Sequence, residues 1–181
     1  METYPLISHP DHPALTVTRV EARIIGIDDE WVRFRWRIEG CGSLVVPPFA
    51  GKGRADELWQ TTCFEVFIRP DEDSAHYIEL NLSPSERWNA YAFARYREGM
   101  AEHSMPREPD CTMRVGQSMA IFDAAVPRAG LPPFPWQFGM SAVIEEQGGT
   151  KSYWAIAHPE GKPDFHHPAC FAATLPAPAA S

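Results

Sequence analysis

Apolar and basic side chains alternate without a break in Trp31-Val-Arg-Phe-Arg-Trp-Arg-Ile-Glu39, the most regular stretch of this sequence. Successive side chains of a β-strand point to opposite faces, so Phe34, Trp36 and Ile38 share one face and the arginines share the other. We therefore predict a strand with an apolar core side and a charged solvent side.

Further short runs of strand type lie on both sides of this stretch, with turn residues between them. They cover residues 15–24, 44–46, 61–69, 76–83, 88–95, 111–115, 119–126, 136–146, 153–158 and 171–174. The pair Gly148-Gly149 is a hairpin signal, and 18 prolines leave few windows for a long helix. This pattern predicts an all-β fold with little helix, an antiparallel two-sheet β-sandwich of jelly-roll type.

A length of 181 residues fits one ordinary domain. We expect an extended N-terminal segment over residues 1–14, a single sandwich domain over 15–175 and a flexible, Pro/Ala-rich tail over 176–181. Residues 96–110 have no clean period, and we predict a loop there.

Charge and targeting signals narrow the function classes. A formal net charge of −8 argues against nucleic acid as a partner. No apolar run is long enough to span a membrane, and no basic segment followed by an apolar one opens the chain, so we expect a cytoplasmic protein. The four cysteines are too widely spaced for a metal site of the CxxC type, and we predict buried free thiols.

Three neighbouring strands, 61–69, 76–83 and 88–95, place unusual side chains on the face opposite the core. That face holds Glu65, Glu79, Asn81, Asn89 and Tyr91, together with Arg35 and Arg37 if the strand 31–39 lies in the same sheet. Sugar hydroxyls need donors and acceptors, and sugar rings stack on aromatic planes, for which the candidates are Trp59, Trp136 and Trp154. Solvated cross-strand pairs and core tryptophans are the plainer interpretation of the same residues.

Several motifs of the sequence carry a family resemblance. They are Glu57-Leu-Trp-Gln-Thr-Thr-Cys-Phe-Glu-Val-Phe-Ile68, Tyr77-Ile-Glu-Leu-Asn-Leu-Ser-Pro-Ser85, Trp88-Asn-Ala-Tyr91, Tyr96-Arg-Glu-Gly-Met100, Tyr153-Trp-Ala-Ile-Ala-His-Pro159 and Lys162-Pro-Asp-Phe-His-His167. With these the chain resembles bacterial DOMON-like proteins, which are related to the family 9 carbohydrate-binding module.

The resemblance implies a β-sandwich related to sugar-binding and haem-binding domains. In the sugar-binding relatives a glycan end is held between aromatic planes and fixed by carboxylate, amide and cationic side chains. Trp59, Gln60 and Glu65 are the residues that the resemblance carries over best. The complete set of predicted ligand-binding residues is Trp59, Gln60, Glu65, Glu79, Asn81, Asn89, Tyr91, Arg37 and Trp154.

Two other ligand chemistries follow from single residue types. Haem would need axial ligands, for which the candidates are Met113, Met119, Met140, His103 and His158, although none lies in a cytochrome motif. Asp164, His166 and His167 resemble a partial metal site, but a turn with exposed histidines is the favoured explanation. The acidic run 71–73 lacks the spacing of a calcium loop. We predict no cofactor and no metal.

Catalysis would require an activated group. Glu65 and Glu79, on adjacent strands, resemble the carboxylate pair of a retaining glycosidase, and Cys63 would need a nearby histidine. No phosphate-binding loop, GxSxG or HExxH motif occurs. We therefore predict a binding module without catalysis, whose ligand is a saccharide or a similar polyhydroxylated small molecule. The alternatives are a haem-binding domain and a sandwich that docks a partner protein.

Overall fold

The computed structural model describes residues 2–177, so residues 178–181 of the predicted flexible tail lie outside the described part. Within residues 2–177 there are thirteen strands and four short 3-10 helices. The strands are β1 (Thr3–Ser8), β2 (Arg19–Ile27), β3 (Trp31–Glu39), β4 (Gly53–Arg54), β5 (Cys63–Arg69), β6 (Tyr77–Leu82), β7 (Arg87–Phe93), β8 (Ala101–Glu102), β9 (Asp110–Val115), β10 (Met119–Pro127), β11 (Trp136–Glu146), β12 (Thr150–Ala155) and β13 (Ala173–Leu175). The helices are η1 (Cys41–Ser43), η2 (Leu58–Gln60), η3 (Arg128–Gly130) and η4 (Pro168–Cys170).

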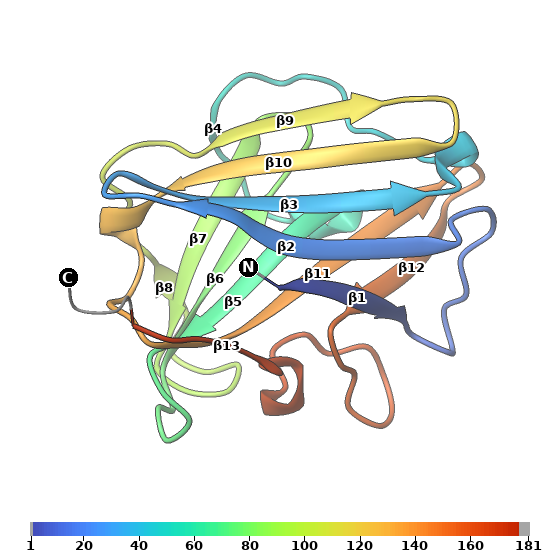
Figure 1. Cartoon of the computed structure of the whole chain (residues 1–181). Coiled ribbons are helices and arrows are strands. Elements are labelled where there is room, and N and C mark those ends of the chain that lie inside the picture. Colours follow the sequence, from blue (N-terminus) through green and yellow to red (C-terminus); the bar gives the residue numbers. More distant parts are fainter. Residues whose placement is uncertain (1, 178–181) are drawn as a thin grey trace.

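The strands lie in two layers (Figure 1): β9, β10, β3 and β2 run across the front, and β7, β6, β5 and β11 pass behind them at an angle. The all-β prediction is confirmed. The arrangement differs in detail from two separate antiparallel sheets, because a single hydrogen-bonded path runs β4-β7-β6-β5-β11-β12-β1-β2-β3-β10-β9 and the β4–β7 pair is parallel.

Strand β1 joins the two layers. It pairs with β2 through residues Thr3–Leu6 and with β12 through Ile7 and Ser8. The N-terminal segment predicted to be extended over residues 1–14 thus contains a strand, and the sheet already includes Thr3. This strand contains Pro5, which has no N–H to donate. The residues around Pro5 pair with β2 on one side only, and a proline is tolerated at such an edge position.

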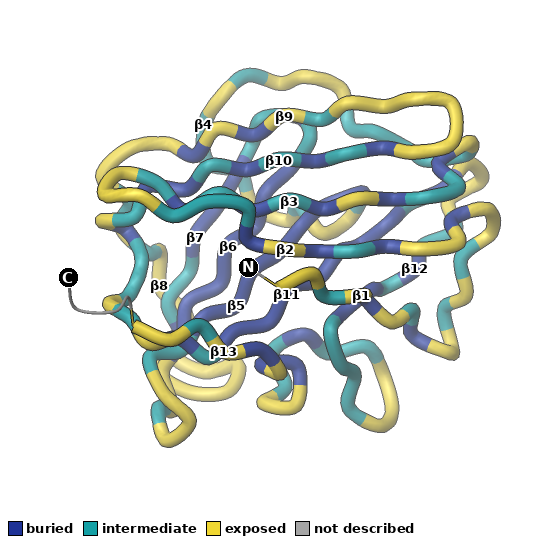
Figure 2. Tube along the Cα trace, viewed as in Figure 1, coloured by how far each residue is buried: buried dark blue, intermediate teal, exposed yellow. Residues whose placement is uncertain are grey.

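The hydrophobic core lies between the layers. On β3 the predicted alternation is confirmed: Phe34, Trp36 and Ile38 are fully buried. Trp36 contacts Phe64 of β5, and Phe64 stacks on Phe122 of β10 with ring centroids 4.2 Å apart. Figure 2 shows buried residues alternating with partly buried or exposed ones along the front strands, whereas β5 and β6 are buried along almost their whole length.

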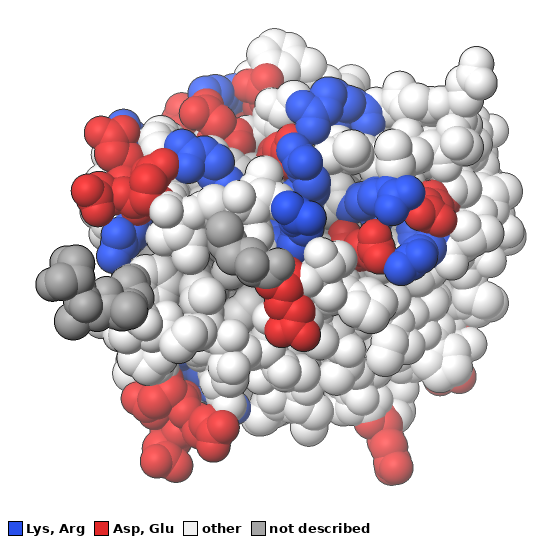
Figure 3. Space-filling model, viewed as in Figure 1, with Lys and Arg blue, Asp and Glu red and all other residues white. Residues whose placement is uncertain are grey.

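The solvent-exposed face of the front layer carries several ion pairs. Arg35 binds Asp123 through two hydrogen bonds of 2.6 and 2.9 Å, and Arg37 lies between Glu21 and Glu39. Figure 3 shows basic and acidic side chains interspersed on this face. Such cross-strand pairs of opposite charge are common on the solvent-exposed face of a sheet.

Several smaller predictions can be compared with the strands. Gly148 and Gly149 form the β11–β12 turn with positive φ, as predicted. Residues 44–46 form only an isolated bridge from Leu44 to Glu146 rather than a strand. The four cysteines are buried and free, which confirms the thiol prediction. Among the described residues no helix is long and apolar enough to cross a membrane.

Candidate functional site

The back layer carries a second buried face. Strands β5, β6 and β7 turn one set of side chains into the core and the alternate set outward, as the sequence pattern predicts. On the outward side Glu65 pairs with Asn81, and Glu79 pairs with Tyr91. The outward side is also apolar in part, since a second cluster that includes Phe67, Tyr77, Phe93, Val143, Phe165 and Phe171 packs there.

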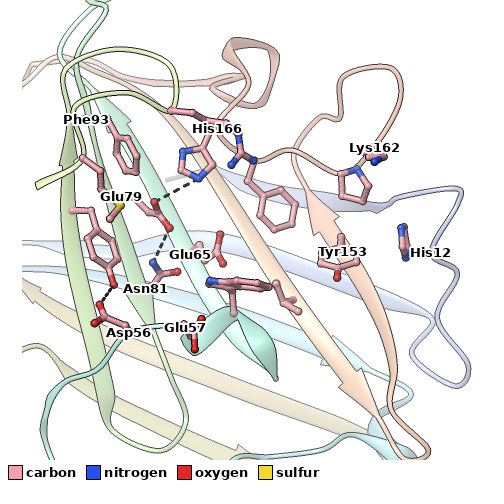
Figure 4. Close-up of a pocket in the computed structure, with 17 residues that line it drawn as sticks. His12, Asp56, Glu57, Glu65, Glu79, Asn81, Phe93, Tyr153, Lys162 and His166 are labelled. Atoms are coloured by element: carbon pink, nitrogen blue, oxygen red, sulfur yellow. Dashed lines mark hydrogen bonds and ion pairs between the residues drawn. The ribbon is translucent and has the colours of Figure 1, made fainter. Parts of the chain in front are cut away.

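Loops cover this face and leave a pocket of about 1050 Å³. Figure 4 shows the glutamates on its floor, with His166 and Phe93 on one side and Lys162, Tyr153 and His12 toward the other. The walls therefore come from four separate parts of the chain: the start, the segment before β5, the segment after β7 and the segment after β12.

Two carboxyl groups form the floor of the pocket. Glu65 is 3% exposed and Glu79 is 7% exposed. The side-chain amide of Asn81 donates a hydrogen bond of 2.7 Å to Glu79 Oε1, and the Nε2 atom of His166 lies 3.6 Å from Oε2. Burial raises the pKa of Glu79 to about 7, against the opposing effects of Asn81 and the Arg97 charge. Burial, and then the charge of Glu79, raise the pKa of Glu65 well above its usual range.

A histidine is fixed above Glu79. The backbone N–H of Arg97 donates to the Tyr77 hydroxyl, which lies 2.8 Å from Nδ1 of His166. The Tyr77 hydroxyl fixes the Nδ1 side of the ring, as donor or as acceptor according to the tautomer, and Nε2 faces Glu79. Burial, and then the positive charge of Arg97, lower the pKa of His166 to about 4. The imidazole is therefore neutral at pH 7 and supplies no counter-charge to the glutamate.

Arg97 forms its ion pair with Asp164 rather than with the glutamates of the floor. Its Nη2 lies 2.7 Å from Oδ1 of Asp164, and the hydroxyl of Tyr96 donates to the other carboxylate oxygen. Burial opposes these bonds, but together they hold the pKa of Asp164 below its usual value. The ion pair connects the segment after β7 to the segment after β12 and fixes one wall.

A second polar network braces the opposite wall. The Tyr91 hydroxyl donates a 2.5 Å hydrogen bond to Asp56, and the Asn89 amide donates to both of these groups. Arg54 in turn donates to the Asn89 carbonyl oxygen at 2.7 Å. Burial, and then the hydrogen bond to Asp56, raise the pKa of Tyr91 above its usual range, so this phenol remains neutral.

Trp59 stands at the pocket with an exposed ring. It lies on η2 and is 50% exposed, although a large aromatic side chain is ordinarily buried. Glu57, which precedes η2, has left-handed backbone angles (φ 59°, ψ 26°), a conformation that costs an ordinary residue about 1 kcal/mol or more. Backbone strain of this kind gathers at functional sites, and here it sets the direction of the helix that carries Trp59.

The pocket brings together five of the predicted residues: Trp59, Glu65, Glu79, Asn81 and Tyr91. Asn89 lies behind them and supports Tyr91. Gln60 is exposed and lies outside the pocket lining.

Two predicted residues lie away from this pocket. Trp154 is 5% exposed in the core, because on β12 it is Tyr153 that faces the pocket. Arg37 lies on the outer face of β3 in the front layer, among Glu21 and Glu39. Trp136, the third candidate stacking plane, is also buried in the core at 1% exposure.

Twelve further lining residues were outside the predicted set, among them Asp56, Glu57, Phe93, Arg97, Tyr153 and His166. Strand alternation contains a signal for two of them, since Phe93 follows Asn89 and Tyr91 at period two and Tyr153 is the alternate of a core tryptophan. The other named residues are on loops, where no periodicity applies. His166, predicted in an exposed turn, is instead packed against Phe67 and Phe93.

The residues proposed for other chemistries are dispersed. Met140 is buried in the core, Met119 contacts Arg37, His103 contacts the Gly130 carbonyl and His158 contacts the Ile7 carbonyl. No group of three ligand-type side chains that would hold a metal occurs in residues 2–177. Cys63 contacts the oxygens of Phe64, Asn81 and Leu82, so the proposed dyad with a histidine does not form.

The fold has solved counterparts. No protein-family model matches the chain, and no curated protein matches it significantly. A candidate carbohydrate-binding protein from Bacteroides uniformis superposes with a TM-score of 0.64 at 18% identity, over 98% of this chain and 86% of that one. A family 9 carbohydrate-binding module from Caldicellulosiruptor kristjanssonii, solved in complex with glucose, superposes with a TM-score of 0.56 at 10% identity over the same shares. The chain therefore has the fold of these proteins.

Proposed function

We propose that this protein binds a saccharide, or a similar polyhydroxylated small molecule, in the pocket over β5, β6 and β7. The observation that carries the proposal is the composition of the pocket floor, where Glu65, Glu79 and Asn81 gather beneath an exposed tryptophan. The fold adds support, because the module from Caldicellulosiruptor kristjanssonii was solved with glucose bound and the Bacteroides uniformis protein is a candidate carbohydrate-binding protein.

Each element of the floor has a role in such binding. The carboxylates of Glu65 and Glu79 accept hydrogen bonds from sugar hydroxyls, and Asn81 both donates and accepts. Trp59 offers an indole face to the C–H side of a sugar ring. Because Trp59 is half-exposed and the glutamates are buried, the ligand enters past the ring and places its polar edge on the floor.

We propose binding without catalysis. In a retaining glycosidase one carboxylate is ionised and attacks while the other delivers a proton. Here burial raises the pKa of both glutamates, so neither is held as a fully ionised nucleophile at neutral pH. Burial also raises the pKa of Cys63 well above its usual range, which disfavours its thiolate.

Isothermal titration calorimetry with D-glucose, D-galactose, cellobiose and cellotriose tests the proposal. We expect at least one of these sugars to bind, and the Trp59→Ala variant to bind it more weakly by about 1 kcal/mol or more, since a stacked ring is lost. The matched control is Trp31→Ala, a partly exposed tryptophan that contacts Arg107 rather than the pocket. If folded wild-type protein binds no sugar of a wider glycan array either, the proposal is wrong.

A further inference from the structure

The floor of the pocket lacks a positive charge. Glu65 and Glu79 are both more than nine-tenths buried, and both line the cavity. Glu65 accepts no side-chain hydrogen bond of ordinary geometry within the described chain. The Ser141 hydroxyl lies opposite it on β11 and acts to lower its pKa, but forms no well-aligned hydrogen bond. A buried carboxyl group without a partner is costly, and such groups are ordinarily paired with a cation.

The nearby cations do not fill that role. Arg97 forms its ion pair with Asp164, and His166 is neutral at pH 7. Lys162 lies toward the far side of the cavity from Glu79 in Figure 4. On the near side Asp56 and Glu57 add two further acidic groups. The region around the floor is thus biased toward negative charge.

Aromatic rings stand around the same acidic floor. Trp59, Tyr91, Phe93 and Tyr153 all line the cavity. The face of an aromatic ring attracts a cation, so rings and carboxylates together form a favourable environment for an ammonium group. A neutral sugar would form hydrogen bonds with the carboxyl groups, but it would bring no positive charge to favour their ionised form.

From this arrangement we infer that the preferred ligand is an amino sugar, a polyhydroxylated compound whose protonated amine lies between Glu65 and Glu79. This inference rests on the proposed function and specifies its ligand class. The ammonium group donates to the two carboxylates, and the ring hydroxyls bond to Asn81 and to the walls. A proton held by the carboxyl pair in the free protein leaves for the buffer when the ammonium group binds, so the charge of the floor remains balanced.

Calorimetry with three ligands at pH 7, below the ordinary pKa of an amine, tests the inference. D-glucosamine carries the ammonium, D-glucose has a hydroxyl in its place, and N-acetyl-D-glucosamine has a neutral amide. We expect D-glucosamine to bind roughly tenfold or more tightly than the other two, the scale of one charge-assisted hydrogen bond. Equal affinity for D-glucose and D-glucosamine would overturn the inference while leaving the proposed function intact; no binding of any sugar would remove both.

Proton release gives a second readout that does not depend on a variant. At pH 6.5, titrations in buffers of different ionisation enthalpy measure the protons exchanged on binding. Glu79 is faced by Glu65, Asn81, Tyr91, Arg97 and His166. Burial raises the pKa of Glu79 to about 7, so Glu79 holds a dissociable proton near this pH, whereas the pKa of His166 is lowered to about 4. We expect proton release with D-glucosamine and none with D-glucose. The absence of release with D-glucosamine contradicts the inference.

Variants locate the effect on the floor. In Glu65→Gln and Glu79→Gln the preference for D-glucosamine over D-glucose should fall to about onefold, because the charge is lost while the shape remains. Glu108→Gln, an exposed acidic residue outside the pocket, is the matched control and should keep the preference. A preference that survives in both floor variants would show that another group holds the amine. If either variant fails to fold, the wild-type comparison and the proton release still decide.

Discussion

A carboxylic acid placed inside a protein without a cation resists ionisation, and the two floor glutamates share this condition. For Glu79 the consequence has a defined direction. Its pKa is about 7 in the folded protein and near 4.5 when exposed, so between these values the folded state binds more protons than the unfolded state. Stability therefore falls as the pH rises through this window.

We expect Glu79→Gln to flatten this dependence. In the wild type Glu79 should contribute a decrease in the free energy of unfolding from pH 5 to pH 7 of at most about 1.4 kcal/mol per pH unit, while the lowered pKa of His166 acts in the opposite direction in both proteins. The Gln variant has no charge to bury, so its decrease should be smaller. Urea denaturation at several pH values measures the difference, and parallel curves for the two proteins would contradict the assigned pKa.

A different glutamate holds an element in place. The buried carboxylate of Glu146, at the end of β11, accepts hydrogen bonds from the backbone N–H groups of Leu15, Thr16 and Val17 at 2.6, 2.7 and 3.2 Å. The hydroxyls of Thr16 and Ser43 donate to it as well. This one side chain thus accepts hydrogen bonds from three consecutive backbone N–H groups of the segment between β1 and β2.

Removal of that anchor should destabilise the fold. We expect Glu146→Ala to lower the free energy of unfolding by about 3 kcal/mol, because several buried donors lose a charged acceptor. Glu145→Ala changes the adjacent residue of the same strand, whose side chain faces the other way, and should have an effect below about 1 kcal/mol. Chemical denaturation of the two variants compares them directly; similar losses would show that the anchor is dispensable.

The segment with Phe165 and His166 forms the roof of the pocket, and its position depends on a close approach between β11 and η4. A Cβ atom at Gly139 would lie 2.4 Å from the carbonyl oxygen of Cys170, so only glycine permits the contact. The segment held there includes Phe165 and His166, which line the cavity. The glycine therefore links the packing of an element to the shape of the site.

Gly139→Ala should both destabilise the protein and weaken binding. We expect a loss of about 1–3 kcal/mol in stability from overpacking. We also expect a higher Kd for the bound sugar, as the roof moves outward. Gly42→Ala serves as the control, since a Cβ atom there meets no atom within 4 Å. Unchanged binding by a destabilised Gly139→Ala protein would separate the roof from the site.

At the scale of the whole molecule, the tryptophans divide into a core set and a site residue. Trp36, Trp88, Trp136 and Trp154 are at most 5% exposed, and Trp31 stands partly exposed beneath Arg107. Of the six tryptophans, Trp59 is the one that lines the pocket. Its position makes ligand binding visible in the intrinsic fluorescence of the entire protein.

We expect a saturating sugar to shift tryptophan emission to shorter wavelength, because the ligand excludes water from the indole of Trp59. In Trp59→Phe the shift should disappear while the emission of the buried tryptophans remains. Fluorescence titration with the sugar found by calorimetry makes the measurement. A shift that persists in Trp59→Phe would place the ligand against another tryptophan.

The sequence by itself determined the strands and their faces. Alternation at period two identified β3, β5, β6, β7, β10 and β11, and it assigned Glu65, Glu79, Asn81 and Tyr91 to one surface. This succeeds because the side-chain direction in a strand is a local property of the backbone. The same alternation places Tyr153 on the pocket face of β12, but the sequence prediction took the neighbouring Trp154 as the stacking residue because of its residue type.

Only the tertiary structure decided how that surface becomes a cavity. Arg97, Asp164 and His166 lie on loops, and their meeting above Glu79 depends on contacts between residues more than sixty positions apart. The front and back layers were likewise separated only in space, which moved Arg37 to the opposite side of the molecule. Local periodicity fixes which way a strand residue points, whereas the position of a loop is set by packing and charge pairing across the whole chain.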